Sequence, residues 1–140
     1  MSLYFQQHPA RMKLQEWLEL RNEMETDAQP VVNWFVLDSK GLLLARAPVN
    51  PVDPSTIGNN YARRTYFHGG PGDYKDLQDY LNSGAEPLTR THLSAAFESE
   101  STRTPLWAVS EPVFDEKDVV AIVGLRVKIG KAPDESSAPP

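Results

Sequence analysis

The sequence predicts one α+β domain at residues 1–130, in which a long N-terminal helix packs on an antiparallel sheet of about five strands. Three features lead to this fold class. The first residues have helical periodicity, later segments have the composition of strands, and a segment rich in glycine and proline separates two predicted strands from three others. Strands joined by short turns pair antiparallel, and the intervening segment is long enough to cross over the sheet. We expect the helices to lie on one side of this sheet.

Composition and charge indicate a globular domain and exclude several classes of function. The chain has 140 residues, 40% of them hydrophobic and 24% charged, which suffices for one hydrophobic core. A net charge of −5 argues against a nucleic-acid partner. The absence of cysteine removes disulfides, thiolate nucleophiles and cysteine-ligated metals. No apolar run is long enough to span a membrane, and the first residues lack the features of a signal peptide.

Helical periodicity extends from about Phe5 to Thr26 and ends before Pro30. A helix of about twenty residues is about 30 Å long, which is more than a small core requires. We expect its apolar stripe to pack on the sheet, while the surplus length covers an edge of the sheet, pairs with a second copy of the chain or leads back to a membrane anchor. The stripe consists of Ala10, Leu14, Trp17 and Leu18.

Segments rich in β-branched and aromatic residues predict the strands. Val31 to Leu37 is apolar on both faces, which is typical of a central strand. A turn with Gly41 at the position of unusual dihedral angles joins it to the next strand as a hairpin. The last strand has one continuous apolar face, which is expected to be buried, and its other face becomes polar and increasingly solvated toward Arg126 and Lys128. The remaining predicted strands are Leu42 to Ala45, about His92 to Glu98, Leu106 to Phe114 and Val119 to Ile129.

The crossover is expected to contain a short helix from Tyr74 to Leu81. Asp73 is a plausible N-cap of this helix, and Gly84 is a candidate for its C-terminal cap. After the last strand, residues 131–140 are rich in proline, serine and alanine and are expected to form a flexible linker.

The segment Ile57 to Gly70 is the candidate binding site. Arginine presents a planar fork of donors that fits a carboxylate, and aromatic rings form rigid apolar walls. These are the groups that a pocket for a small organic anion requires. The alternative is that the arginines lie on solvated faces and the aromatic rings fill the core. The residues concerned are Arg63, Arg64, Tyr61, Tyr66 and Phe67.

Three blocks of sequence resemble a Cache domain: Trp34 to Ala45, Ile57 to Gly69 and Pro105 to Leu125. The resemblance covers about Phe5 to Ile129 and implies a PAS-like fold with a ligand pocket between sheet and crossover. Cache domains are extracytoplasmic, periplasmic sensor modules of bacterial membrane receptors, and the resemblance is greatest to those of serine/threonine kinases or histidine kinases. It implies that the chain senses a small molecule and relays the signal through the membrane. Any kinase or other output domain would belong to the parent protein, so this chain is not expected to be an enzyme.

In Cache domains that bind amino acids, the arginine of an R-x-W-[YF] motif holds the ligand carboxylate. Arg64 to Phe67 fits this frame, so the resemblance implies Arg64 as the anchor and Tyr61, Tyr66 and Phe67 as walls. Arg63 is the alternative anchor, because adjacent helical residues point about 100° apart. His92 and Trp107 are expected to line the floor of the pocket.

The groups that hold the ligand amine in those proteins are incomplete in this chain. Asn59 stands near the position of the upstream tyrosine, and the predicted strand from His92 contains no aspartate. A simple carboxylate therefore fits the residues as well as an amino acid does.

Other kinds of chemistry have little support. His68, His92 and Glu98 match no standard metal-binding spacing, and no serine lies in a nucleophile elbow. We therefore expect no metal, no cofactor and no catalytic residue. The alternative function is a dimerisation or interaction module that works through the N-terminal helix, as a homodimer, without a small-molecule ligand.

Overall fold

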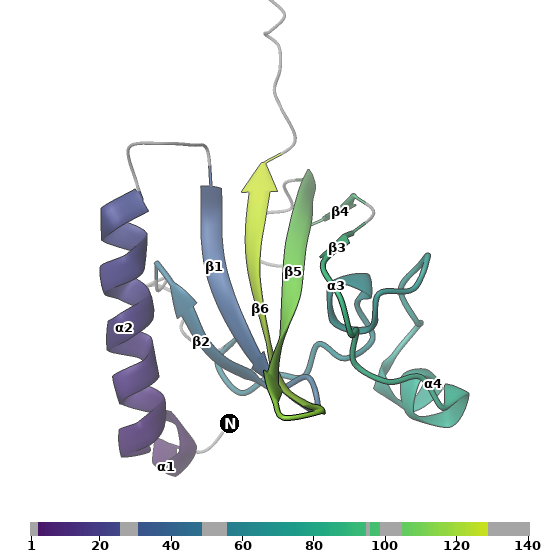
Figure 1. Ribbon diagram of the computed structural model, residues 1–140, viewed down its shortest axis with the longest axis horizontal. Helices are drawn as coiled ribbons and strands as arrows, with labels where there is room; N and C mark the ends of the chain where they lie inside the picture. Colours follow the sequence, from purple (N-terminus) through teal and green to yellow (C-terminus); the bar gives the residue numbers. More distant parts are fainter. Residues whose placement is uncertain (1–2, 26–30, 49–55, 95, 99–104, 129–140) are drawn as a thin grey trace, which may run out of the picture.

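The computed structural model describes residues 3–25, 31–48, 56–94, 96–98 and 105–128. Its centre is an antiparallel sheet with the strand order β2-β1-β6-β5-β3, and β4 also pairs with β5 (Figure 1). The predicted α+β class, with an N-terminal helix packed on an antiparallel sheet, is confirmed. The elements are α1 (Leu3–Gln6), α2 (Pro9–Glu25), β1 (Val31–Asp38), β2 (Leu43–Ala47), α3 (Thr65–His68), α4 (Leu77–Ser83), β3 (His92–Leu93), β4 (Phe97–Glu98), β5 (Pro105–Asp115) and β6 (Asp118–Lys128).

The N-terminal helical region is interrupted at Gln7 and His8, just before Pro9, so the single helix expected from Phe5 is divided into α1 and α2. Proline disfavours the helical conformation of the residue before it. The ring of that residue, His8, instead accepts a hydrogen bond from the backbone N–H of Ala10 at 3.1 Å. The long helix is therefore α2 alone.

Helix α2 lies along β2, the edge strand of the sheet. The guanidinium of Arg11 donates to the carbonyl of Leu44 at 2.7 Å, and the Gln15 amide hydrogen-bonds to both backbone groups of Arg46. Leu18 of α2 is fully buried against β1 and β2, whereas Trp17 is 53% exposed. The predicted stripe therefore packs on the sheet only in part, and its Trp17 side faces solvent.

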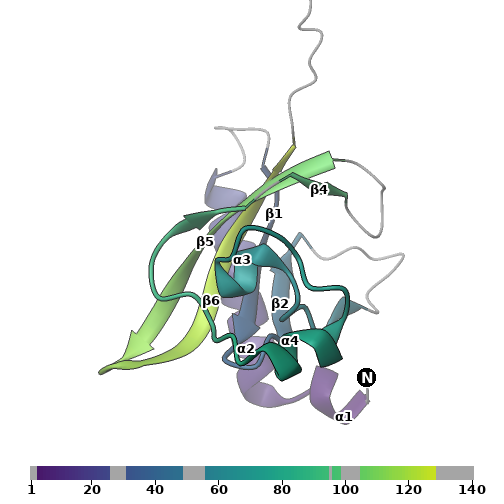
Figure 2. The same cartoon turned by 90° about the vertical axis from the view of Figure 1, so that its right-hand side faces the viewer.

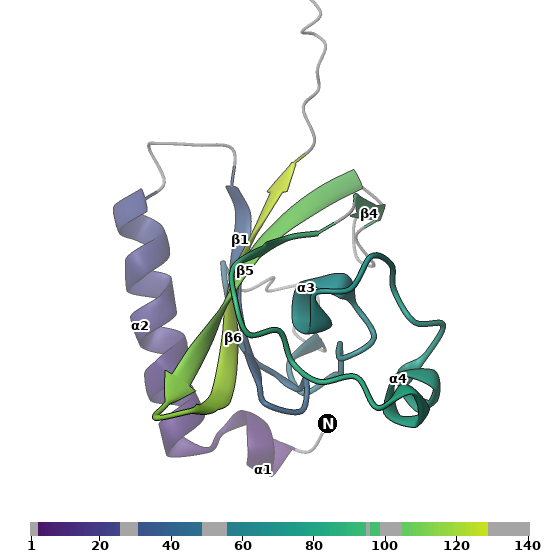
Figure 3. The same ribbon diagram turned by 45° about the vertical axis from the view of Figure 1, so that its right-hand side comes forward.

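The two faces of the sheet are covered by different parts of the chain. Val36 of β1 packs with Leu18 of α2, and its neighbours Phe35 and Leu37 pack with Tyr66 in the crossover. Successive residues of a strand point to opposite faces, so α2 and the crossover lie on opposite sides of the sheet (Figure 3). The expectation that all helices share one side is wrong, because β1 is apolar on both faces and needs cover on each.

The hairpin of β1 and β2 and the opposite edge of the sheet match the elements that the sequence predicts. Gly41 has a φ of 94°, and the Asp38 carboxylate accepts from the backbone N–H groups of Lys40 and Leu42. At the other edge, β3 and β4 pair one after the other with β5, so together they occupy the place of the one strand expected from about His92 to Glu98.

Helix α4 begins later than expected. Its N-cap is Asp76, whose carboxylate accepts from the backbone N–H of Asp79 at 2.9 Å, so Asp73 is not the cap of this helix. Gly84 ends the helix in the left-handed conformation, as predicted. The linker expected at residues 131–140 lies outside the described part of the chain. Among the described residues, no helix has the length and apolar character needed to cross a membrane.

Candidate functional site

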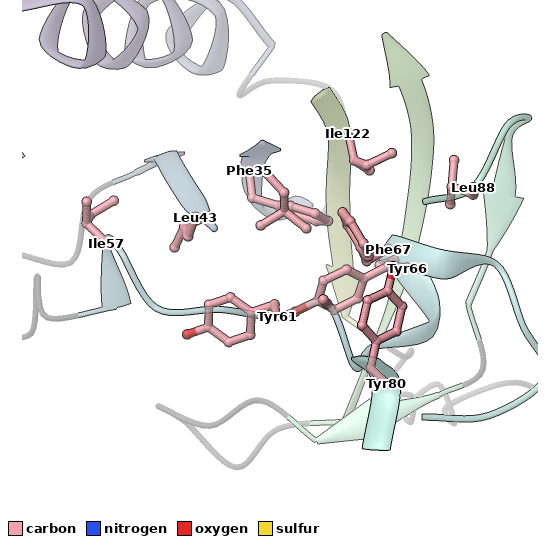
Figure 4. Packing of buried hydrophobic residues seen from close by; sticks show 12 residues of the cluster. Phe35, Leu43, Ile57, Tyr61, Tyr66, Phe67, Tyr80, Leu88 and Ile122 are labelled. Carbon is pink, nitrogen blue, oxygen red and sulfur yellow. The ribbon is translucent and has the colours of Figure 1, made fainter. Parts of the chain in front are cut away.

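The crossover segment lies over one face of the sheet, with α3 in front of β5 and β6 (Figure 2). Its aromatic residues point into the space between crossover and sheet, where Tyr66 meets Phe35 at 4.9 Å between ring centres (Figure 4). Phe67 is fully buried and contacts Tyr80 edge to face at 5.9 Å. Tyr61 is 7% exposed and belongs to the same cluster. The three predicted wall residues are therefore brought together, as the core that holds the crossover on the sheet.

Arg64, the predicted anchor, is buried beside this core with a carboxylate of the chain next to it. Its Nη1 donates to Asp73 Oδ2 at 2.9 Å. The other carboxylate oxygen of Asp73 accepts from the backbone N–H of Thr65 at 2.9 Å, at the start of α3. Asp73 thus fixes the loop after α3 to the beginning of that helix, and it balances the charge of Arg64.

Arg63 lies nearer the surface of the crossover than Arg64, and both guanidinium groups approach Asp73 Oδ2. The Nη1 of Arg63 donates to the carbonyl of Tyr74 at 3.3 Å and lies 3.9 Å from Asp73 Oδ2, and 30% of its side chain is exposed. A partly solvated ion pair at this distance contributes little to stability. Arg63 is therefore positioned to tie the loop together at its surface.

His68 packs between the loop that follows α3 and helix α4. The backbone N–H of Gly70 donates to Nδ1 at 3.0 Å, so the proton is on Nε2, which lies 3.0 Å from the carbonyl of Arg63. The ring also packs against Tyr74 and Tyr80. Burial lowers the pKa of His68 below its ordinary value of 6.5, against smaller opposing effects of the Arg63 carbonyl and of Asp73.

We expect acid to destabilise the crossover through His68. The folded protein holds this ring neutral, so between its lowered pKa and 6.5 the unfolded chain binds more protons, and stability rises with pH across that interval. The melting temperature should therefore fall as the pH is lowered through 6.5, and His68→Gln should flatten that slope. The measurement is a series of thermal melts from pH 7.5 to pH 5.

His8 provides the matched control, because it is an exposed histidine just before α2. His8→Gln should retain the slope of the unaltered protein. An unchanged slope in His68→Gln would contradict the buried neutral state of this ring.

A groove of about 370 Å³ opens beside α3, lined by His68, Gly69 and residues 87–92. Gly69 has a φ of 77°, and a Cβ at this position would lie 3.2 Å from the Cβ of Leu88. The backbone N–H of Leu88 donates to the carbonyl of Phe67, which fixes this wall of the groove to α3. Arg90 and His92 give the groove groups that can contact a polar molecule.

Of the two residues expected to line the floor, His92 lies at the groove and Trp107 does not. His92 is partly buried, and its Nε2 is buried without a hydrogen-bond partner among the described residues. Trp107 is 43% exposed and precedes Ala108, which belongs to the core under the crossover. Trp107 must therefore point to the opposite face, the side of the sheet on which α2 lies.

The sheet carries polar side chains toward the crossover that sequence patterns did not single out as a site. Arg46 is 8% exposed and donates to Thr56 Oγ1 at 2.9 Å. The guanidinium carbon of Arg126 lies 5.2 Å from the ring centre of Phe35. The interpretation of Arg126 as part of an open, solvated face is therefore wrong, since this face of β6 lies under the crossover. The sequence signal that could have identified Arg126 is its position among alternating apolar residues in a strand that is central to the sheet.

Metal binding has no support in the described part of the chain, where no group of three or more histidine, aspartate or glutamate side chains is placed to hold an ion.

Comparison with known proteins identifies solved structures of the same fold. The sensor domain of the V. cholerae histidine kinase DctB matches with a TM-score of 0.62 and 18% identity over 90% of this chain and 40% of that one. The ligand-binding domain of the Campylobacter jejuni chemoreceptor Tlp3, in complex with 4-methylisoleucine, matches with a TM-score of 0.56 and 8% identity over 91% and 44%. An extracellular ligand-binding receptor from Desulfohalobium retbaense matches with a TM-score of 0.54 and 17% identity over 83% and 18%.

These likenesses confirm the predicted fold, which the chain shares with these sensor and ligand-binding domains. The chain spans less than half the length of each of these structures. No protein-family model matches the sequence, and no curated protein matches it.

Proposed function

We propose that this chain is the extracytoplasmic sensor domain of a bacterial membrane receptor, located in the periplasm, and that it binds a small organic anion such as a carboxylate or an amino acid. The proposal is supported by the fold that the chain shares with sensor and ligand-binding domains, among them Tlp3 solved with 4-methylisoleucine and with L-valine. The ligand would lie between sheet and crossover. A protein kinase or another output domain would follow in the parent protein, and this chain would itself have no enzymatic activity.

The observation that carries the choice of an anion is the placement of arginines on the crossover side of the sheet. Arg46 and Arg64 are each 8% exposed, and Arg126 lies over the Phe35 ring, although the chain has a net charge of −5. Burying a guanidinium costs free energy unless an anion or hydrogen bonds compensate it. Three guanidinium groups on this side of the sheet are donors that fit an anionic ligand, although Asp73 already pairs with Arg64.

Signal transmission would follow from the connections of the crossover. A ligand that binds better to one arrangement of crossover and sheet shifts the population toward that arrangement, and it must prefer it by a few kcal/mol for a clear response. Helix α2 is hydrogen-bonded to the β2 backbone, and β6 is the central strand. These two elements would carry the change toward the membrane.

The sensor function and the predicted anchor are tested together by a thermal-shift screen. The panel contains amino acids, short monocarboxylates and dicarboxylates, and amines. Ligand at about 100 times its dissociation constant adds about 2.7 kcal/mol of stability, which is readily detected. The screen is repeated on Arg64→Ala and on Asp73→Ala, which remove the same ion pair from its two sides.

If Arg64 holds the ligand, the ligand-induced shift should vanish in Arg64→Ala and persist or grow in Asp73→Ala, because the ligand no longer competes with Asp73. The shift is compared with each variant's own melting temperature, so a general loss of stability does not affect the result. Binding to Arg64→Ala as tight as to the unaltered protein would remove Arg64 as the anchor. A panel without any shift would count against the sensor function.

One observation favours the second candidate, a dimerisation module. Trp17, Leu20 and Met24 of α2 are 53%, 58% and 72% exposed, and their spacing places them on one side of the helix. Tight self-association that responds to no small molecule and is lost in Leu20→Glu would favour this function over ligand sensing.

A further inference from the structure

The side of the sheet that carries α2 is covered only in part. Leu18 of α2 packs with Val36 of β1 and Ala45 of β2, and Figure 1 shows the helix at the β2 end of the sheet, with β5 toward the other end. On β5 burial alternates along the strand, and the residues that face the α2 side are exposed from Pro105 to Val113. The β5 half of this face therefore lies open to solvent.

This open part of the sheet is apolar where a solvated face is normally polar. Antiparallel sheets with one face in water alternate apolar residues inside with polar residues outside. The exposed positions of β5 instead hold Trp107, Val109 and Val113, with the acidic Glu111 between the two valines. Contiguous apolar surface of this kind marks a place where another molecule binds.

The strand register extends the apolar surface across four strands. Val109 lies opposite Leu93 of β3 on one side and Leu125 of β6 on the other, and Leu125 lies opposite Trp34 of β1. Residues directly opposite each other in a sheet share a face, so this row is continuous. We name the surface the open sheet face, and it consists of Leu93, Trp107, Val109, Val113, Val123 and Leu125.

A hollow of about 250 Å³ lies in the open sheet face, between Trp34, Val109, Val113, Val123 and Leu125. Pockets that bind small molecules usually have about 300–1,000 Å³ and enclose most of their ligand. This hollow is smaller, is mostly apolar and lies on the surface of a sheet. Its size and lining suit a single large apolar side chain of a protein partner.

Helix α2 presents side chains of this kind. Trp17, Leu20 and Met24 are each more than half exposed. Leu20 follows the buried Leu18 by two residues, which places it about 200° round the helix, so these side chains point away from the sheet of their own chain. The helix does not cover the open sheet face of its own chain, because hydrogen bonds from Gln15 hold it on β2.

A second copy of the chain is the partner that fits both surfaces. The helix stands on one half of this side and the open sheet face occupies the other half, so a two-fold axis between them places α2 of each copy on the open sheet face of the other. Helix α2 has 17 residues and is about 25 Å long, and β5 and β6 have 11 residues each and are about 36 Å long. One helix and one strand pair present roughly 600 Å² per copy, which approaches the area of about 800 Å² per partner in a standard interface.

The charges on the two surfaces are also complementary. Glu111 lines the hollow as its one charged residue. Lys13 is exposed and lies one turn before Trp17 on the same side of α2. When Trp17 of one copy occupies the hollow of the other, Lys13 is within reach of the partner's Glu111. A charge pair at such a place contributes to the specificity of pairing more than to its strength.

We propose that two copies of the chain pair through two identical helix-on-sheet contacts, in which α2 of one copy packs on the open sheet face of the other and Trp17 occupies the hollow. The interface lies on the side of the sheet opposite the crossover, so it leaves the proposed ligand site open. It differs from a pairing of α2 with α2 alone, which would leave the hollow and Val109 exposed.

The interface is tested by sedimentation velocity on a concentration series of the domain. The unaltered domain should pass from monomer to dimer between about 1 and 100 μM. Leu20→Glu on the helix and Val109→Glu on the sheet should each raise the dissociation constant about tenfold or more. Leu81→Glu is the matched control, because Leu81 of α4 is as exposed as Leu20 but lies outside the interface, and it should change nothing. A monomer at about 1 mM, or an unchanged dissociation constant in Val109→Glu, would overturn the proposal.

Cross-linking separates helix-on-sheet pairing from helix-on-helix pairing. The chain has no cysteine, so single cysteines can be introduced without a background reaction. Leu20→Cys and Val109→Cys are prepared separately, one of them with a size tag, and then mixed and treated with a short bismaleimide. The two variants should be linked to each other more than either is linked to itself, whereas Leu81→Cys should be linked to neither. Predominant linking of Leu20→Cys to itself, or no linked dimer, would contradict the proposal, and this result does not depend on the folding of Val109→Glu.

Discussion

Replacing Phe67 with alanine is expected to lower the free energy of unfolding by about 3–5 kcal/mol. The ring is fully buried, packs edge-on against Tyr80 and belongs to the cluster that joins the crossover to the sheet. Removing it leaves a cavity that the surrounding strands and helix cannot close. A domain of this size has about 5–15 kcal/mol of stability in total, so the loss should be evident in urea unfolding followed by far-ultraviolet circular dichroism.

Trp107→Ala is the control for this prediction, because both aromatic residues were expected to line the same pocket. Trp107 is 43% exposed on the opposite face of the sheet, so its removal should cost about 1 kcal/mol or less. An equal loss in the two variants would mean that Trp107 is buried in the folded protein. A loss below about 1 kcal/mol for Phe67→Ala would mean that the crossover is not held by this core.

Gly124→Ala is expected to destabilise the domain by about 3 kcal/mol, although it adds a single methyl group. A Cβ at this position would lie 2.3 Å from Cζ of Phe35, a ring that is fully buried and already in contact with Tyr66. Neither the central strand nor the ring can move away without disturbing the core. The measurement is again the midpoint and slope of urea unfolding.

Gly72→Ala is the matched control, since an added Cβ there meets no atom within 4 Å. Its stability should stay within about 0.5 kcal/mol of the unaltered protein. The steric cause can be tested with Phe35→Leu, which shortens the opposing side chain. The double variant of Gly124→Ala with Phe35→Leu should be more stable than the sum of the two single losses predicts. Simple additivity would contradict a direct clash between these positions.

The fold could be predicted from the sequence because its main signals are local. The apolar composition of Val31 to Leu37 predicted a central strand, Gly41 predicted the turn of the hairpin, and Gly84 predicted the end of a helix. The side on which each helix lies could not be predicted in the same way. That choice depends on which face of β1 each one covers, and both faces are apolar.

The site was less predictable, because it depends on which side chains meet across the fold. The sequence placed Asp73 at the start of α4, whereas its carboxylate bonds Arg64 and Thr65 near α3. Trp107 was expected on the pocket floor, but strand alternation turns it to the other face. Arg126 and Asn33 lie far apart in the sequence and become neighbours only through the pairing of β1 with β6.

That pairing also sets the order in which the protein can fold. The β5–β6 hairpin joins strands that are adjacent in sequence. Strand β1 instead pairs with β6, which is made much later, from Val31 opposite Val127 to Asp38 opposite Ala121. Contacts between residues so distant in sequence slow folding, because the entropic cost of closing a long loop must be met before these contacts form. During synthesis, the first hairpin and α2 therefore emerge with the central position of their sheet empty. The exposed edge of β1 is then the surface on which a chaperone, or a second unfinished chain, would act before β6 takes its place.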